Sequence, residues 1–230
     1  MKKETIKDLL HRFMIFKDLT DFEMEPIVDL AKNRPFRKGS HIFMQDDPLT
    51  NVYFIYEGKI KIYKTDFHGK EQIVNILQPG DMFPHQGFFR KDNYPAHAEV
   101  AENAVLIYIP IAQFEDFLIT HPEICVKLFR VLGDLIVDLQ SRLEEKILDN
   151  TYEQIIKLLL RLCKSHGVEK KDGIYQLTTQ FTNRELASMI GSSRETVSRT
   201  LTQLKKKNMV LSTGQDKIVI DFHKLHEEII

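Results

Sequence analysis

The order of hydrophobic and polar positions divides the chain into three regimes. Between residues 2 and 32, apolar residues recur at helical spacing and predict short helices. Between Pro35 and Pro110, short runs rich in Val, Ile, Phe and Tyr alternate with turn signals, which is typical of a sandwich or barrel. The runs are HIFMQ, NVYFIYEGKIKIYK, EQIVNIL and AVLIYI. The turn signals are Arg37-Lys38-Gly39, Glu57-Gly58, His68-Gly69 and Gln78-Pro79-Gly80-Asp81.

One long helix dominates the third regime, which starts near Ile111. From Glu123 to about Asp149 the apolar residues recur mostly every three or four positions, which predicts a helix of roughly 27 residues and about 40 Å. A helix of this length with a heptad-like seam usually pairs with another helix, and packing on its own β domain is the alternative. The predicted dimer seam is Leu128, Leu132, Leu135, Leu139 and Leu143.

Cap and break residues at 149–151 place a domain boundary after this helix. The pattern then predicts a helix from about Tyr152 to Ser165, a polar loop (SHGVEKKDG) and a short strand (IYQLTT). Two helices follow, over about 182–190 and 192–207. Two strands, MVLST and KIVI, joined at Gly214-Gln215-Asp216, and a terminal helix complete the chain.

The segment FTNRELASMIGSSRETVSRTL carries the signals of two short helices joined by a tight turn. Thr182 caps the first helix, and Glu185 three residues later completes a capping box. Gly191 ends that helix, where a positive φ is easiest for glycine. Ser192 or Ser193 caps the next helix. This arrangement predicts a helix-turn-helix motif.

The second helix of this motif has one apolar and one polar stripe. Val197, Leu201 and Leu204 fall at i, i+4 and i+7 and therefore face the core. The opposite stripe is Arg194, Glu195, Ser198 and Arg199. Arginine donates a bidentate pair to guanine and glutamate accepts from cytosine, so this stripe suits the major groove. A solvated helix face would explain the charges but not the caps and the glycine. Further DNA contacts are expected from Thr182, Ser193, Lys205 and Lys206.

The charge distribution supports a localised contact with a polyanion. The chain carries a net charge of −1. From Thr178 to Lys217, however, seven basic and three acidic side chains give +4, so the remainder carries −5. A basic patch on a nearly neutral protein favours nucleic acid as its partner.

Composition excludes several other classes of protein. No apolar run approaches the roughly 20 residues that a membrane helix needs. Charged residues between positions 8 and 17 interrupt any signal-peptide core, so we expect a cytoplasmic protein with no membrane partner. Two cysteines, Cys125 and Cys163, cannot supply four thiolates to an iron–sulfur cluster or a cysteine-only zinc site. Nucleophile-elbow, P-loop and HExxH motifs are absent, so we expect no catalytic residues and no enzyme.

The segment GSSRETVSRTL resembles the recognition segment of the Crp/Fnr superfamily of bacterial transcription regulators. IYEGKIKIYK and LQPGDMF resemble the cyclic-nucleotide-binding-type β-roll of that family, so the resemblance covers essentially the whole chain. It implies an α+β fold with a jelly-roll-like sensor domain over 1–122, a dimerisation helix over 123–149 and a winged helix-turn-helix DNA-binding domain over 150–230.

The same resemblance implies a homodimer that binds double-stranded DNA at an inverted repeat with TGTGA-like half-sites and contacts RNA polymerase. The family's base-reading Arg, Glu and Arg fall on Arg194, Glu195 and Arg199. One departure is Thr200, where the family usually has an apolar core residue.

The sensor segment departs further from the family members that bind cyclic AMP. Those members carry Gly-Glu and then Arg-Ser or Arg-Thr, whereas this chain has Pro84-His85 and Tyr94-Pro95. Leu139 stands where the long helix normally offers a hydroxyl to the base. We therefore expect a signal other than cyclic AMP, with Arg90 or Lys91 as candidate substitute cations for a phosphate.

The residues of a predicted effector pocket have two interpretations. Met82, Phe83, Phe88, Phe89 and Tyr94 line either an apolar pocket or, as we favour, the core of the roll; His85, His97 and Leu139 complete the set. We expect no cofactor; ligation of haem or a metal by His85 and His97 is the alternative. Two rival functions stay open: a binding module that acts mainly through protein partners, and a ligand-independent regulator controlled by its abundance.

Overall fold

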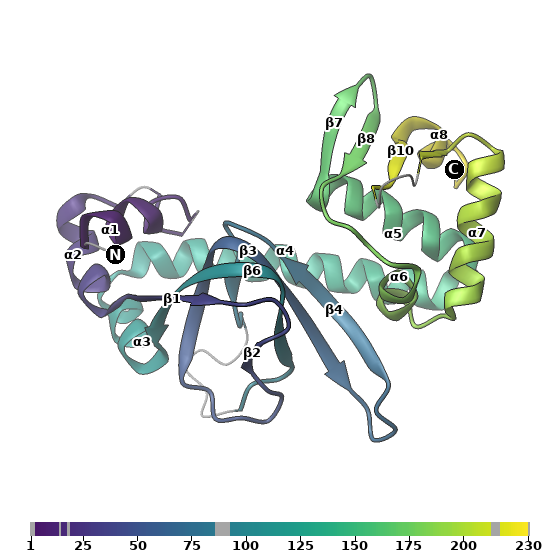
Figure 1. Ribbon diagram of the computed structural model, residues 1–230. Coiled ribbons are helices and arrows are strands. Elements are labelled where there is room, and N and C mark those ends of the chain that lie inside the picture. The colour runs from purple at the N-terminus through teal and green to yellow at the C-terminus, as the bar shows by residue number, and fades with distance from the viewer. Residues whose placement is uncertain (1–2, 14, 18, 86–92, 213–216, 230) are drawn as a thin grey trace. The chain divides into compact units, whose positions relative to one another are not determined.

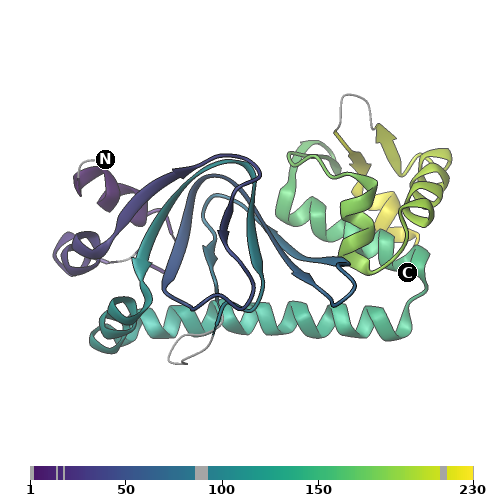
Figure 2. The ribbon, with the colours of Figure 1, turned by 60° about the horizontal axis from the view of Figure 1, so that its bottom comes forward.

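The computed structural model describes residues 3–13, 15–17, 19–85, 93–212 and 217–229 (Figure 1). The chain forms two compact units, residues 1–137 and 138–230. Their boundary lies inside the long helix α4 (Pro122–Leu148), which continues without interruption through it (Figure 2). Among the described residues, no helix is long and apolar enough to span a membrane.

The first unit is built on a six-stranded antiparallel sheet. Its strands are β1 (Lys32–Phe36), β2 (His41–Phe43), β3 (Asn51–Thr65), β4 (Glu71–Leu77), β5 (Met82–Phe83) and β6 (His97–Pro110). The order is β1-β6-β3-β4, with β2 paired to β6 and β5 paired to β3. Strands β3 and β6 pair over almost their whole length and form the centre of the sheet.

Two features of this sheet differ from the sequence-based expectation. Glu57-Gly58 is not a turn between strands but a bulge within β3, where the register with β6 shifts. Gly58 has φ +87°, and a Cβ there would lie 2.3 Å from the backbone oxygen of Asn103, so only glycine fits. Strand β1 is absent from the prediction because Pro35 interrupts its pattern, yet an edge strand tolerates proline.

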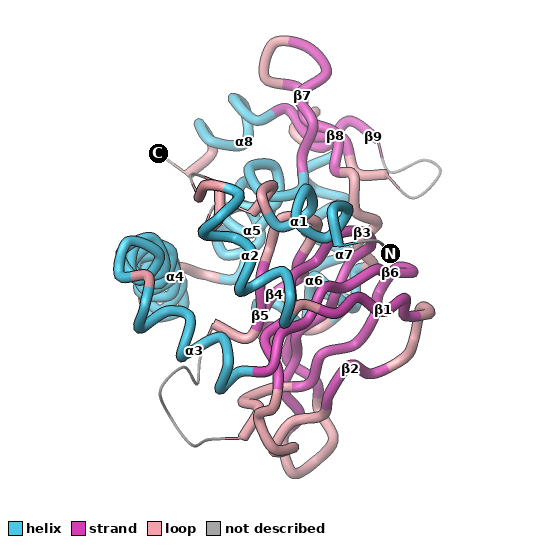
Figure 3. Tube along the Cα trace, turned by 90° about the vertical axis from the view of Figure 1, so that its left-hand side faces the viewer, coloured by secondary structure: helices cyan, strands magenta, loops and turns pink. Residues whose placement is uncertain are grey.

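Three short helices, α1 (Lys3–Leu10), α2 (Asp21–Leu30) and α3 (Ile111–Thr120), gather at one end of the sheet (Figures 1 and 3). Thr20 and Glu23 form a capping box at the start of α2. The sequence analysis predicted the long helix from Glu123 but no separate helix α3 before it. The helices are distinct because His121, which precedes Pro122, adopts a non-helical conformation (φ −130°, ψ 72°).

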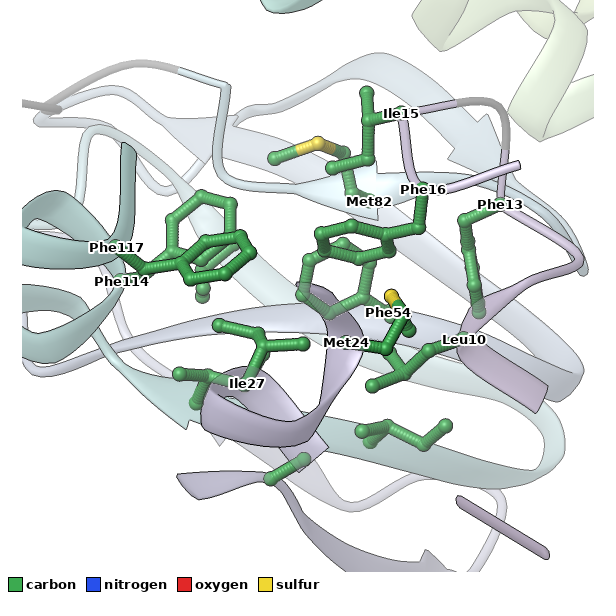
Figure 4. Close-up of a cluster of buried hydrophobic side chains, with 14 of the residues drawn as sticks. Leu10, Phe13, Ile15, Phe16, Met24, Ile27, Phe54, Met82, Phe114 and Phe117 are labelled. Carbon is green, nitrogen blue, oxygen red and sulfur yellow. The ribbon is translucent and has the colours of Figure 1, made fainter. Parts of the chain in front are cut away.

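The two faces of β3 bury different cores, which explains why its buried residues are consecutive. Phe54 packs with the helices, and its ring centroid lies 5.3 Å from that of Phe16 and 5.9 Å from that of Phe114 (Figure 4). Tyr53 and Ile55 point to the opposite face of the sheet and join a second, aromatic core. The six strands that enclose this second core are called the roll below.

The second unit combines helices with a four-stranded antiparallel sheet. The helices are α5 (Thr151–His166), α6 (Asn183–Ile190), α7 (Arg194–Lys206) and α8 (Phe222–Glu227). The strands are β7 (Gly167–Lys171), β8 (Ile174–Leu177), β9 (Val210–Ser212) and β10 (Val219–Asp221), in the order β7-β8-β10-β9. The turn predicted at Gly214-Gln215-Asp216 lies outside the described residues.

Strand β7 corrects the prediction of a polar loop in SHGVEKKDG. It pairs with β8 from Gly167↔Leu177 to Lys171↔Ile174. Most of its residues are exposed, so the strand lacks the alternation of apolar and polar residues on which the sequence analysis depends.

Candidate nucleic-acid interface

Helices α6 and α7 form the predicted helix-turn-helix, and hydrogen bonds fix both of their starts. The Thr182 hydroxyl accepts from the Glu185 amide at 3.2 Å, and the Glu185 carboxylate accepts from the Thr182 amide at 2.8 Å. The Ser193 hydroxyl accepts from the Thr196 amide at 3.1 Å and starts α7. Gly191 adopts φ +67° between the helices. These caps satisfy amides that the helices leave free.

One face of α7 holds the helix against its own unit. Val197 and Leu204 are fully buried, and Leu201 is 5% exposed. Thr200, the departure from the family pattern, is also buried. Because the apolar face is covered, the opposite face is presented to solvent in one defined orientation.

The exposed face of α7 carries the predicted base-reading side chains. Arg194, Glu195, Ser198 and Arg199 are all exposed. Hydrogen bonds to its own backbone amide and to the Ser193 hydroxyl lower the pKa of Glu195, and the nearby arginines act in the same direction. The carboxylate is therefore ionised at neutral pH and accepts hydrogen bonds, as contact with a cytosine amino group requires.

The flanking residues predicted to contact DNA have different surroundings. Thr182 and Ser193 are exposed while their hydroxyls cap helices. Lys205 and Lys206 are exposed in the last turn of α7, where cations interact favourably with the negative end of the helix dipole. Lys207, next in sequence, instead pairs with the Glu228 carboxylate and lies 3.3 Å from the Tyr152 hydroxyl. The triple-lysine run therefore does not act as one patch.

Two further exposed residues of the helix-turn-helix were not among the predicted DNA contacts. Arg184 lies in the first turn of α6 and is exposed. Thr202 lies one turn beyond Ser198 on α7, and its hydroxyl donates to the Ser198 carbonyl at 2.9 Å. The i, i+4 spacing from Ser198 was the signal that would have found Thr202.

The long helix α4 exposes an apolar stripe that shares Leu139 and Leu143 with the predicted seam. Leu128 is only 5% exposed and belongs to the core of the first unit, and Leu132 and Leu135 are partly buried. Leu139 and Leu143 are exposed, at 66% and 60%. The other strongly exposed members are Phe129, Ile136 and Ile147. Positions 129, 136 and 143 are spaced by seven residues, which is the spacing of a coiled-coil seam.

Inside the roll, Tyr94 is built into the aromatic core. Its ring stacks on Phe43, and its hydroxyl accepts from the Asn51 amide at 3.1 Å and donates to the Asn51 carbonyl at 3.2 Å. Its own backbone amide donates to the Asp47 carbonyl at 2.8 Å. The polar atoms of Tyr94 are therefore engaged by the loop that follows β2 and by the first residue of β3.

Within the first unit, the predicted effector-pocket side chains that are buried divide between two cores. Met82 belongs to the core beneath the helices, whereas Phe83 and Tyr94 belong to the core inside the roll. Phe88, Phe89, Arg90 and Lys91 lie outside the described residues. Of the two interpretations, the described residues support core packing.

The two candidate haem or metal ligands have other surroundings. Nδ1 of His97 accepts from the Gln45 amide at 3.1 Å, and its ring stacks on Tyr63 with centroids 4.8 Å apart. Burial lowers the pKa of His85. Within the described part of the chain, no three His, Cys, Asp or Glu side chains gather as a metal site requires.

Comparisons with known proteins agree with the division into a roll and a helix-turn-helix unit. A cyclic nucleotide-binding domain model matches residues 33–121, and a Crp-like helix-turn-helix domain model matches residues 153–228. The global nitrogen regulator of Synechocystis sp. is 28% identical over 90% of this chain and 89% of its own length. A CRP-like cAMP-activated global transcriptional regulator of Mycobacterium tuberculosis is 24% identical over 95% and 97%.

A solved structure supports the same fold. FixK2 from Bradyrhizobium japonicum superposes with a TM-score of 0.74 at 22% identity, covering 86% of this chain and 96% of that one.

Proposed function

Because the chain belongs to the Crp/Fnr superfamily of bacterial transcription regulators, we propose that it binds an inverted-repeat operator as a homodimer. We also propose that it responds to a signal other than cyclic AMP. It is a DNA-binding regulator and not an enzyme. We infer that it acts in the cytoplasm together with RNA polymerase.

One observation carries the proposal for DNA. Arg194, Glu195 and Arg199 are exposed on a helix whose start is capped and whose opposite face is buried. A major groove about 12 Å wide admits such a helix, and the side chains match the donors and acceptors of G·C pairs. Half-sites resembling TGTGA follow from this set and from the family resemblance.

The exposed stripe on α4 supports the homodimer. Phe129, Ile136 and Leu143 lie seven residues apart, and Leu139 and Ile147 extend the stripe. Exposed apolar side chains at this spacing gain most from a second helix with the same pattern, so the partner we propose is a second copy of the chain. Two-fold symmetry would place the two recognition helices about 34 Å apart, one turn of DNA.

The interior of the roll supports the proposal about the signal. A buried cyclic phosphate needs a cation and several amide donors. The position that supplies an arginine in cyclic AMP-binding members is Tyr94, whose hydroxyl is engaged by Asn51. One relative is a cAMP-activated regulator, and this chain departs from the cyclic AMP-binding pattern at Tyr94 and Pro84. The same observation at Tyr94 is also compatible with a regulator that needs no ligand and is controlled by its abundance.

Selection from random-sequence duplexes tests this function. Purified protein is incubated with the library at about 150 mM salt, because low salt exaggerates non-specific binding. We expect enrichment of an inverted repeat whose half-sites resemble TGTGA. Enrichment of no motif, or of one lacking two-fold symmetry, would contradict the proposal. The rival function, a module acting through protein partners, predicts no enrichment.

A further inference from the structure

The last turn of α4 contacts the helix-turn-helix directly. Nζ of Lys146 donates a hydrogen bond of 2.9 Å to the backbone oxygen of Ile190. Ile190 is the last residue of α6, whose final carbonyl groups have no amide partner within the helix. A Cβ at Gly191 would lie 3.8 Å from Nζ, so the ammonium group sits beside the turn itself. Lys146 thus caps the end of α6 from a different helix.

Neighbouring side chains attach the same turn of α4 to α5. Glu145 pairs with Arg161, and Asp149 pairs with Lys157 at 2.7 Å. The Glu145 and Asp149 side chains are only 16% and 14% exposed, which shields these pairs from solvent. Nε2 of Gln154 also donates to the Asp149 carbonyl at 2.9 Å. The end of α4 is therefore held by the second unit and is not a free linker.

Lys146 stands between the exposed apolar stripe and the recognition helix. Leu143 and Ile147 of the stripe lie three residues before it and one residue after it. On the other side, Ile190 is followed by a turn of three residues before α7 begins at Arg194. One hydrogen bond therefore joins the helix that would pair in the dimer to the turn that starts the recognition helix.

We infer that Lys146 is a positioning residue, which fixes the angle between α4 and α7 and thereby sets the spacing of half-sites that the dimer accepts. This inference rests on the proposed homodimer and inverted-repeat operator. Lys146 touches no base in this account. Its effect is on the orientation of the recognition helix. Adding one base pair between half-sites rotates one of them by about 34° and moves it by about 3.4 Å relative to the other, so the spacing that the dimer accepts depends on that orientation.

The ion pairs beside Lys146 separate a positioning role of this residue from a role in stabilising the fold. Arg161 and Lys157 hold α5 against α4, so the unit stays folded when the Lys146 hydrogen bond is lost. What is lost is the contact with the α6–α7 turn. The expected consequence is a recognition helix that tolerates a wider range of angles and therefore discriminates less between operators of different spacing.

The test measures binding to three duplexes with the selected half-sites, one with the preferred spacer and two with spacers one base pair shorter and longer. Lys146→Met keeps the aliphatic stem and removes the donor, Lys146→Arg restores a donor, and Lys164→Met removes an exposed lysine elsewhere in the unit. We expect Lys146→Met to weaken binding to the preferred spacer about three- to tenfold, with a smaller loss on the altered spacers. Lys146→Arg should restore the preference, and Lys164→Met should leave it unchanged.

The outcomes separate this inference from the function on which it rests. Equal weakening on all three duplexes, or an unchanged preference in Lys146→Met, would overturn the positioning role alone. A wild-type protein with no preference for any inverted repeat would overturn the proposed function and this inference with it. Thermal unfolding of each variant identifies a loss of binding that comes from misfolding. In that case Lys146→Leu, which also removes the donor, replaces Lys146→Met in the comparison.

Discussion

The ring of Tyr94 lies flat against the ring of Phe43 inside the roll, with 3.6 Å between centroids and 4° between planes. The Tyr94 hydroxyl accepts a hydrogen bond from the amide of Asn51, the first residue of β3. Tyr94 is 2% exposed. Tyr94, at the position where the resemblance implies an arginine in members that bind cyclic AMP, is therefore part of the protein's own aromatic core.

Calorimetric titration with cyclic AMP and with cyclic GMP should give no binding heat. The missing arginine and the missing amide donors at Pro84 and Pro95 should weaken binding at least about a thousandfold relative to a cyclic nucleotide-binding site. Operator binding by the same preparation shows that the protein is folded. Micromolar binding of either nucleotide that also tightened operator affinity would overturn the assignment.

Removing the Tyr94 hydroxyl should destabilise the protein. Tyr94→Phe keeps the stacked ring but leaves the Asn51 amide without its acceptor, at a cost of about 1 kcal/mol in the free energy of unfolding. Tyr175→Phe is a matched control, because that hydroxyl makes an exposed and long contact of 3.4 Å with Glu169. Urea unfolding followed by circular dichroism measures both. Equal stability of Tyr94→Phe and the wild type would show that the hydroxyl does not hold the loop.

A charge on the exposed stripe of α4 should separate the subunits. Leu139→Asp places a carboxylate at the centre of the proposed seam, and we expect a monomer by light scattering and a loss of operator binding. Ser141→Asp adds the same charge two positions away, on the outer side of the helix, and should stay dimeric. A Leu139→Asp protein that remained a dimer would place the interface elsewhere.

Cys163 should be unreactive in the folded protein. Burial raises the pKa of its thiol to about 12, so at pH 8 roughly one molecule in ten thousand carries the reactive thiolate. In a Cys125→Ser background, a thiol reagent should label Cys163 only after unfolding. The thiol ionises at a lower pH in the unfolded chain than in the folded protein. Ionisation of Cys163 therefore leaves the free energy of unfolding unchanged below about pH 9 and lowers it as pH rises towards 12. Rapid labelling of the native variant would contradict this burial.

The helix-turn-helix could be predicted from sequence because its determinants are local. Thr182 with Glu185, Gly191 and Ser193 each signal a helix end within a few residues, and the structure places all of them in those roles. The dimer seam could be predicted only in part. Spacing locates the apolar positions of α4 but does not tell Leu128, which packs on the core of its own unit, from Phe129, which is exposed.

Two strands could not be predicted from the pattern of apolar and polar residues. Strand β7 is almost wholly exposed, so it has no hydrophobic alternation to detect, and β1 contains a proline that only its edge position permits. The sequence favoured core packing for Met82 and Phe83 but did not show that these neighbours point to opposite faces of the sheet and join different cores. Which core a residue enters depends on what packs on each face, and that is not a local property.

The central claim is that the exposed stripe of α7 reads DNA sequence. Its most direct test compares wild-type protein and Arg199→Ala on the selected inverted repeat and on a duplex in which one guanine per half-site is replaced, with Lys206→Ala as the control for phosphate contact. We expect Arg199→Ala to lose about 1–3 kcal/mol of preference for that guanine, while Lys206→Ala weakens both duplexes equally. An Arg199→Ala protein that kept the full wild-type preference at every guanine of the site would contradict the claim.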